Sequence, residues 1–209
     1  ELKITVGSGD EGSAGVRADN GSSVESSGNT FKSNGKSMKG FDIANGSKVS
    51  SEGDTFVADG PWSRAFQVSS NSSAVIRSAD ITANGGKGYL SGKNASGDVI
   101  VTVISDAPIG IYSGFSSSFD IADSTVKVKG ANARALAVEY NSYGKADNVN
   151  INTEGNNAYA ATVFSKSSLN ISNSTITTNG ENAHAITANG ASSVDISGST
   201  INTKGAGSY

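Results

Sequence analysis

The stretch STITTNG at positions 174–180 returns almost unchanged as STINTKG at positions 199–205, which is 25 residues later. The segments that precede the two copies, SSLNIS at 167–172 and SSVDIS at 192–197, are also 25 residues apart. An echo that keeps its phase over two consecutive blocks indicates an internal repeat, and periods of roughly 20 to 50 residues are typical of solenoid folds. The period therefore has to be followed along the whole chain before local structure is assigned.

A small residue followed by a short apolar pair marks the same phase of every period. The steps between successive copies are 25, 25, 23, 22, 25, 25 and 25 residues, so the pattern covers the chain and predicts a single domain over residues 1–209. The small residues are Gly15, Gly40, Ala65, Gly88, Gly110, Ala135, Ala160 and Ala185. A second apolar site recurs at Val6, Phe31, Phe56, Ile81, Val103, Val126, Ile151, Ile176 and Ile201.

Each period contains three short segments in which apolar and polar residues alternate, as in SVDIS at 193–197. Alternation with β-branched residues predicts half-buried strands, and the Asn-Gly pairs between them supply turns where a positive φ costs little. Three such strands bury an apolar face only when they stack on similar neighbours. We therefore expect an all-β protein, a right-handed single-stranded parallel β-helix with about 25 residues per coil and about eight or nine coils, ~4.8 Å apart.

Composition and charge narrow the classes of partner. The 16 basic and 19 acidic residues give a net charge of −3, which is too small to indicate binding to nucleic acid or to an anionic membrane surface. The chain has no cysteine, which excludes disulfides and thiolate metal sites. We find no signal peptide and no apolar run of membrane-spanning length. Because the chain starts and stops within the pattern, we expect a piece of a longer protein.

If the second apolar site points inward, its neighbours point outward and stack once per coil. The column just before it is rich in threonine and consists of Thr30, Thr55, Asp80, Thr102, Thr125, Asn150, Thr175 and Thr200. A partly charged column three residues after it includes Asp59, Asn84 and Asp106. Stacked Thr and Asn on exposed strands gain a few tenths of a kcal/mol per pair, so the ladder has a purely structural explanation. The alternative is that this flat, hydrogen-bonding face also docks another copy of the rod.

A second candidate site combines basic residues with an aromatic one. Lys39, Arg64 and Lys87 each precede a small residue, and Trp62 is the one large aromatic residue off the apolar phase. Exposed tryptophan is common in interfaces, so these residues are a candidate contact for a glycan or an acidic partner. Solvated turn residues give the same pattern, and Ile109 interrupts the column. Both interpretations stay open.

The sequence offers no catalytic constellation. Glycoside hydrolysis needs two convergent carboxylates, and the nearest pair in phase, Asp59 and Asp106, lies two coils apart, about 9–10 Å by strand spacing. His184 is the one histidine and has no phased serine and aspartate for a nucleophilic triad. No metal-ligand spacing or phosphate-binding motif occurs, and the nearly constant turn length leaves no long loop to wall a cleft. We expect no enzyme activity, no catalytic residue, no metal and no cofactor.

The run STITTNGENAHAITANGASSVDISGSTINTKG at 174–205 resembles the coil repeats of self-associating autotransporter adhesins of Gram-negative bacteria, the AIDA type, and more distantly pertactin-like passengers. The likeness covers essentially the whole chain and is clearest over 117–205. It implies a β-helical passenger of the pectate-lyase-like and pertactin-like kind, secreted through a C-terminal translocator barrel that lies outside these residues and is its only link to the membrane. It also implies display at the cell surface of the bacterial outer membrane, or release, and a role in aggregation, biofilm formation, host adhesion and virulence.

The resemblance and the outward ladders together lead to three hypotheses. In the first, rods on neighbouring cells associate side by side through the threonine-rich face, so the partner is the protein itself. In the second, the chain binds a host surface glycan or protein through Trp62 and the basic column, without self-association. In the third, it is part of a polysaccharide lyase or hydrolase. A regular threonine plane for ice binding is interrupted by Lys32, Val57 and Lys127.

Overall fold

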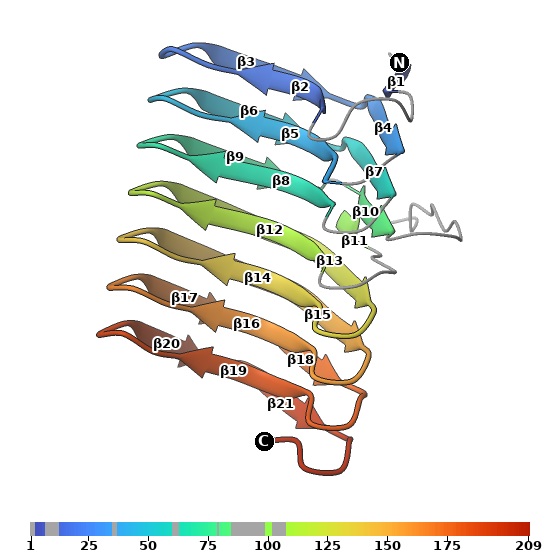
Figure 1. Cartoon of the computed structure of the whole chain (residues 1–209), viewed down its shortest axis with the longest axis vertical. Coiled ribbons are helices and arrows are strands. Elements are labelled where there is room, and N and C mark those ends of the chain that lie inside the picture. The colour runs from blue at the N-terminus through green and yellow to red at the C-terminus, as the bar shows by residue number, and fades with distance from the viewer. Residues whose placement is uncertain are drawn as a thin grey trace.

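The computed structural model describes residues 3–6, 13–34, 37–59, 63–78, 80–84, 99–101 and 108–209, and every regular element among them is a β-strand. The strands pair in parallel and stack into a β-solenoid, or parallel β-helix, of about six turns with about 25 residues per turn (Figure 1). The predicted fold class is therefore confirmed.

The strands lie on three faces of the solenoid. Face 1 is a seven-stranded sheet of β2 (Ala14–Ala18), β5 (Lys39–Ile43), β8 (Arg64–Ser69), β12 (Ile109–Gly114), β14 (Arg134–Val138), β16 (Tyr159–Val163) and β19 (His184–Ala188). Face 2 holds β3 (Ser23–Ser27), β6 (Lys48–Glu52), β9 (Ser73–Arg77), β17 (Ser168–Ser172), β20 (Ser193–Ser197) and the first halves of β13 (Ser118–Lys129) and β15 (Tyr143–Glu154). Face 3 holds β1 (Lys3–Val6), β4 (Thr30–Asn34), β7 (Thr55–Asp59), β10 (Asp80–Asn84), β11 (Val99–Val101), the second halves of β13 and β15, β18 (Thr175–Thr178) and β21 (Thr200–Thr203).

One step along the solenoid is much longer than the others. On face 1, Arg64 pairs directly with Ile109, and on face 2 Ser73 pairs directly with Ser118, a step of 45 residues where neighbouring steps have 25. The sequence spacing predicted a separate coil anchored at Gly88 within this step, and that prediction is wrong for faces 1 and 2. Because the step adds β11 to face 3 alone, the solenoid has fewer turns than the eight or nine expected. Gly88 itself lies outside the described residues.

The pairing on face 3 also corrects two positions of the apolar column. Ile4, and not Val6, is the partner of Phe31, and Val101, and not Val103, is the partner of Val126. Elsewhere the predicted register holds, with Val126, Ile151, Ile176 and Ile201 on successive strands. The step from Ile4 to Phe31 is 27 residues where 25 was expected, whereas the step from Val101 to Val126 is 25 residues where 23 was expected.

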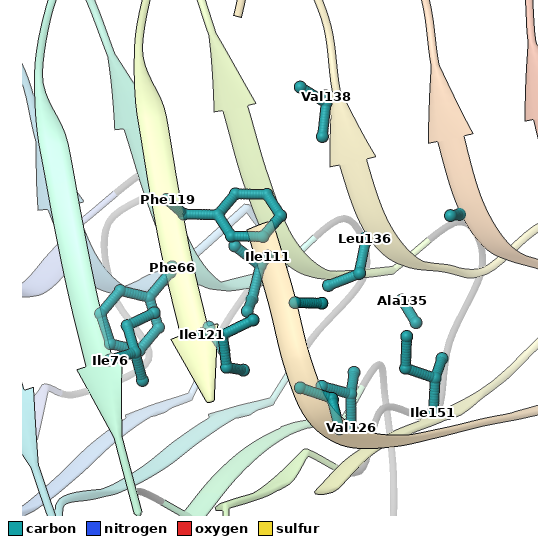
Figure 2. Packing of buried hydrophobic residues seen from close by; sticks show 14 of the residues in the cluster. Phe66, Ile76, Ile111, Phe119, Ile121, Val126, Ala135, Leu136, Val138 and Ile151 are labelled. Carbon is teal, nitrogen blue, oxygen red and sulfur yellow. The ribbon is translucent and has the colours of Figure 1, made fainter. Parts of the chain in front are cut away.

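The core is a continuous column of aliphatic and aromatic side chains between the faces. Phe66, Ile111 and Leu136 on face 1 meet Ile76, Phe119 and Ile121 on face 2 (Figure 2), and all of these are at most 1% exposed. Of the apolar site predicted to point inward, Phe31, Val126, Ile151 and Ile176 are buried as expected. Ile201 is 44% exposed, because β21 pairs with β18 alone.

The small residue of each period lies where face 3 folds into face 1. Ala65, Ala135 and Ala160 are fully buried there. A Cβ atom added to Gly110 would lie 2.6 Å from the carbonyl oxygen of Ala135 on the next turn, which is closer than carbon and oxygen can approach. Glycine at position 110 is therefore required for steric reasons, whereas the turns of Ala65, Ala135 and Ala160 accommodate a methyl group in the core.

A ladder of serines, which the sequence analysis did not identify, holds the turns together where face 1 meets face 2, and its members from Ser47 to Ser167 are buried. In each turn the serine backbone N–H donates to the hydroxyl oxygen of the serine one turn further, at 3.1–3.2 Å. The ladder crosses the 45-residue step through the Ser72–Ser117 bond. Its members, called here the serine ladder, are Ser22, Ser47, Ser72, Ser117, Ser142, Ser167 and Ser192.

Candidate interaction face

The predicted threonine-rich column is continuous in the C-terminal part of face 3. Thr125, Asn150, Thr175 and Thr200 are direct partners on successive strands. Thr125 is half-buried, and the other three are exposed. Since the residue after each points inward, alternation along the strand turns these four side chains outward. We call these four residues the face-3 ladder.

A second polar column runs parallel to the face-3 ladder, two residues further along each strand. Asn152 and Thr177 are partners within it, and the Nδ2 group of Asn179 donates to Oδ1 of Asn152 at 2.9 Å. Lys129 and Glu154 form an ion pair of 2.7 Å at the end of the strands. Lys127, the partner of Asn152, also belongs to this column. The surface therefore presents mainly hydroxyl and amide groups, with Lys127 as a basic residue beside the Lys129–Glu154 ion pair.

A shallow depression of about 350 Å³ adjoins the face-3 ladder on the side of face 2. Thr125, Asn150 and Thr175 form one wall, and the corner asparagines Asn148 and Asn173 form the other. The lining is polar and contains no carboxylate or basic group. It offers hydrogen-bond donors and acceptors to a neighbouring surface without a charge that would select an ionic ligand.

The corner residues are fixed by hydrogen bonds between turns. Asn148 donates its Nδ2 to Oδ1 of Asp123 at 2.9 Å. One turn further, Asp147 Oδ1 accepts from Ser172 Oγ at 2.8 Å and from Asn173 Nδ2 at 2.9 Å. These two hydrogen bonds, that of Ser172 foremost, hold the pKa of the Asp147 carboxyl below its usual value, because they stabilise the ionised form.

The N-terminal part of the predicted column differs from the C-terminal part. Thr30, Thr55 and Asp80 are partners on successive strands, as predicted. However, Thr30 is half-buried and Thr55 is only 9% exposed, so Thr55 does not project freely as we expected. The partner of Thr125 is Ile100 and not Thr102, which breaks the column of hydroxyls at β11. Thr102 and the side chain of Asp80 lie outside the described residues.

The charged column is placed only in part. Asn84 is the partner of Asp59 on the neighbouring strand. The side chains of both residues, and Asp106 as a whole, lie outside the described residues. The outward position predicted for Asp59, Asn84 and Asp106 on the interaction face therefore stays a prediction.

The two described members of the basic column are held by residues of their own face. Lys39 forms an ion pair of 2.9 Å with Asp42. Arg64 bonds to Gln67 and places its guanidinium 4.4 Å from the centre of the Tyr112 ring. Burial lowers the pKa of Arg64 and raises that of Tyr112. Lys87 and Trp62, the other predicted contacts, lie outside the described residues.

A second surface feature was missed by the sequence analysis. Phe115 and Tyr140 are stacked at the turns between faces 1 and 2, with 4.7 Å between ring centres and an interplanar angle of 10°. Both rings are largely exposed. The available signal was an aromatic residue at a turn position that other periods fill with Asn45, Ser70 or Ser165.

Acidic residues do not converge in the part of the chain that the structure describes. Asp120 and Asp195 share one column of face 2 but are three strands apart, with Lys145 and Asn170 between them. Asp120 is paired with Arg77 at 3.2 Å and with Lys145 at 3.7 Å. Among the described residues, no group of three or more His, Asp or Glu side chains is placed to hold a metal ion.

Comparisons with protein-family models, with curated proteins and with solved structures gave no match to this chain. Within the described residues, no helix has the length and apolarity needed to cross a membrane. A solenoid fold hosts many unrelated activities, so function has to be argued from the surface chemistry.

Proposed function

We propose that this chain is a non-catalytic adhesion module of a bacterial cell surface whose solenoids associate side by side through the face-3 ladder. The observation that carries the proposal is the direct stacking of Thr125, Asn150, Thr175 and Thr200 as outward hydroxyl and amide groups on one face of the solenoid. A surface of this kind presents donors and acceptors at the strand spacing of ~4.8 Å, and a second copy presents the same spacing. Two such ladders match each other along their length.

The energetics favour association that is weak for one pair of molecules. Each intermolecular hydrogen bond contributes about 1 kcal/mol or less net, because it replaces bonds to water. Four matched rungs, with the polar column and the depression beside them, give a contact of modest affinity. Display of many copies on a cell multiplies such a contact, since each further pair binds at a high effective concentration.

Location on the outer membrane surface is a part of the proposal that depends on the resemblance of residues 117–205 to autotransporter passengers. The absence of cysteine in the sequence is compatible with export through an oxidising compartment. The composition, rich in small polar residues, also suits a surface in permanent contact with water.

The test places a charge on the proposed contact and measures association. In the double variant Asn150→Glu/Thr175→Glu, like charges would face each other across two matched ladders, which is unfavourable for pairing. We expect loss of concentration-dependent association in sedimentation velocity and loss of clumping of cells that display the variant. The far-UV spectrum should stay that of a β-protein, because both residues are exposed.

The matched control is Asn170→Glu, an exposed asparagine at an outward position of face 2. It adds a charge of the same kind to the same molecule but away from the face-3 ladder, so clumping should persist. Unchanged clumping in the face-3 variant, or equal loss in the control, would contradict side-by-side association through this face.

A further inference from the structure

The aromatic pair Phe115 and Tyr140 lies on an edge of the solenoid that the proposed self-association does not use. The turns that join face 1 to face 2 form the left edge of Figure 1, opposite face 3. In this edge Phe115 is 55% and Tyr140 45% exposed, although their rings stack on each other. Side chains of this size contribute most to stability when they are buried, so their position here needs another explanation.

The backbone at these two residues adds to the argument. Phe115 has a φ of 57° and Tyr140 a φ of 58°, in the left-handed region that bulky residues rarely adopt. The equivalent turn position is filled elsewhere by residues that suit this conformation or have small side chains: Asn20, Asn45, Ser70, Ser165 and Gly190. Large aromatic residues in an unfavourable backbone conformation, exposed and outside the core, point to a functional constraint.

The stack ends in a hollow. Phe115 covers one face of the Tyr140 ring, and the next two turns carry Ser165 and Gly190 at the same position, too small to cover the other face. A depression of about 460 Å³ results, lined by Glu139, Tyr140, Phe164, Ser165, Asn189 and Gly190. This volume lies within the range of about 300–1,000 Å³ that is usual for small-molecule sites.

The lining combines a flat aromatic wall with a few polar groups. Asn189 Oδ1 accepts from the N–H of Gly190 at 2.6 Å, while the Nδ2 group of Asn189 has no acceptor among the described residues. Ser165 lines the same hollow. Glu139 is ion-paired with Arg134, so the depression carries no net charge from these two groups.

We propose that this depression binds a neutral pyranose unit of a glycan, stacked on the free face of Tyr140. A pyranose has an apolar face of C–H groups and a rim of hydroxyls, which is the combination that an aromatic wall beside amide, hydroxyl and carboxylate groups complements. The lining contains no basic residue that would attract the carboxylate of a sugar acid, and Glu139 is already paired with Arg134. The chemistry of the site therefore suits neutral pyranoses better than acidic ones.

The experiment measures saturation-transfer NMR between the protein and a panel of methyl hexopyranosides, with methyl uronates as the anionic comparison. A probe concentration of about 10 mM covers dissociation constants near 1 mM, which are expected for a single shallow subsite. We expect saturable transfer from the protein to neutral glycosides, with the ring C–H protons receiving the strongest effect.

Two variants test the site from opposite directions. Tyr140→Ala removes the stacking wall. Ser165→Tyr fills the depression by extending the aromatic stack one turn, at a position whose φ of 58° equals that of Tyr140. Both should weaken binding about tenfold or more, since stacking and burial on one aromatic ring are lost. The matched control is Tyr143→Ala, an exposed tyrosine on β15 that does not line the depression.

The outcomes separate the proposal from its rivals. Transfer that is lost in Ser165→Tyr and kept in Tyr143→Ala supports a sugar site, even if Tyr140→Ala does not fold. No transfer from any neutral glycoside, or transfer that both site variants leave unchanged, overturns it. Concentration-dependent self-association abolished by Ser165→Tyr, without glycoside binding, also overturns it and assigns the hollow to a second copy. The glycoside measurements do not depend on the face-3 ladder, so failure of the sugar site and failure of the proposed face-3 contact are distinguishable.

Discussion

The N-terminal turns at residues 13–84 and the C-terminal turns at residues 108–209 follow the same path with differently filled cores. In the N-terminal turns, Phe41 packs between Phe31 and Phe66, with ring centres 5.0 and 5.2 Å apart. In the C-terminal turns the position of Phe66 is taken by Leu136 and Ala161, both fully buried. One backbone path therefore accepts side chains of very different volume, provided that neighbouring positions compensate.

Compensation between neighbouring turns is visible at Gly144. A Cβ atom on Gly144 would lie 2.7 Å from Cζ of Phe119 and 2.8 Å from Cδ1 of Leu169, its partners on the turns before and after. The large side chains thus extend over the glycine and fill the space that it leaves. The side-chain volume of the core around Gly144 is therefore balanced over three successive turns, and the strands of these turns keep the same register.

The outer surfaces of the two regions differ as well. In the N-terminal turns Thr55, a member of the predicted threonine-rich column, is buried. In the C-terminal turns three members of the face-3 ladder, Asn150, Thr175 and Thr200, are exposed. The 45-residue step separates the two regions, and β11 places Ile100 in the column there. The proposed interaction face is therefore confined to the C-terminal turns.

The largest expected effect on stability comes from removing an aromatic side chain from the core of the N-terminal turns. Phe66→Ala should lower the free energy of unfolding by about 3–5 kcal/mol, because the side chain is fully buried and the cavity cannot collapse completely. Leu136→Ala, two turns away at the same position, should cost less, since it removes fewer atoms and no aromatic contact. Chemical denaturation followed by circular dichroism measures both. A larger loss for Leu136→Ala would show that the aliphatic turns carry the stability.

A smaller effect is expected from the serine ladder, which both regions share. Ser117→Ala removes the hydroxyl that accepts the buried N–H of Ser72 across the 45-residue step. A buried N–H without an acceptor costs about 1–3 kcal/mol, so the unfolding free energy should fall by that amount. The control is Ser118→Ala, at the next residue, which is outside the serine ladder and partly exposed. Equal stability of Ser117→Ala and the control would mean that water replaces the lost hydroxyl.

The period and the inward phase could be predicted from the sequence because both depend on local alternation and on a steric rule. Gly110, for example, is small because a Cβ atom there would clash with the carbonyl oxygen of Ala135 on the next turn. The pairing of Arg64 with Ile109 could not be predicted, because Gly88 fits the sequence pattern of a coil's small residue. Which of the possible strand partners pairs with Arg64 depends on the register of the whole sheet and not on the local pattern.

The candidate surfaces were predicted less completely than the fold. Thr125, Asn150 and Thr175 follow from the period, so their ladder was found. The exposure of Thr55 depends on what packs beside it, which a repeat pattern does not contain. The hollow beside Tyr140 arises because Tyr140 is followed at the same turn position by the small residues Ser165 and Gly190. A repeat pattern shows what the turns have in common, and this difference between turns is therefore not part of it.

The smallest expected effect concerns the corner of the solenoid beside the face-3 ladder, where hydrogen bonds to the Asp147 carboxylate contribute to stability. Because hydrogen bonds from Ser172 and Asn173 lower the pKa of Asp147 in the folded state, they contribute stability above the ordinary carboxyl pKa, and this contribution is lost as the pH falls through the lowered value. Ser172→Ala removes the donor with the largest effect, so the pKa of Asp147 should rise toward its usual value. The variant should then lose less stability on acidification than the parent.

NMR titration of the Asp147 carboxyl carbon measures this shift directly. Ser168, on the same strand and also partly exposed, makes no hydrogen bond to a carboxylate among the described residues, so Ser168→Ala should leave the titration unchanged. A pKa that stays low in Ser172→Ala would assign the effect to Asn173 and to the neighbouring Lys145. The corner would then be held by charge and amide groups, and the hydroxyl of Ser172 would serve only the strand pairing of the C-terminal turns.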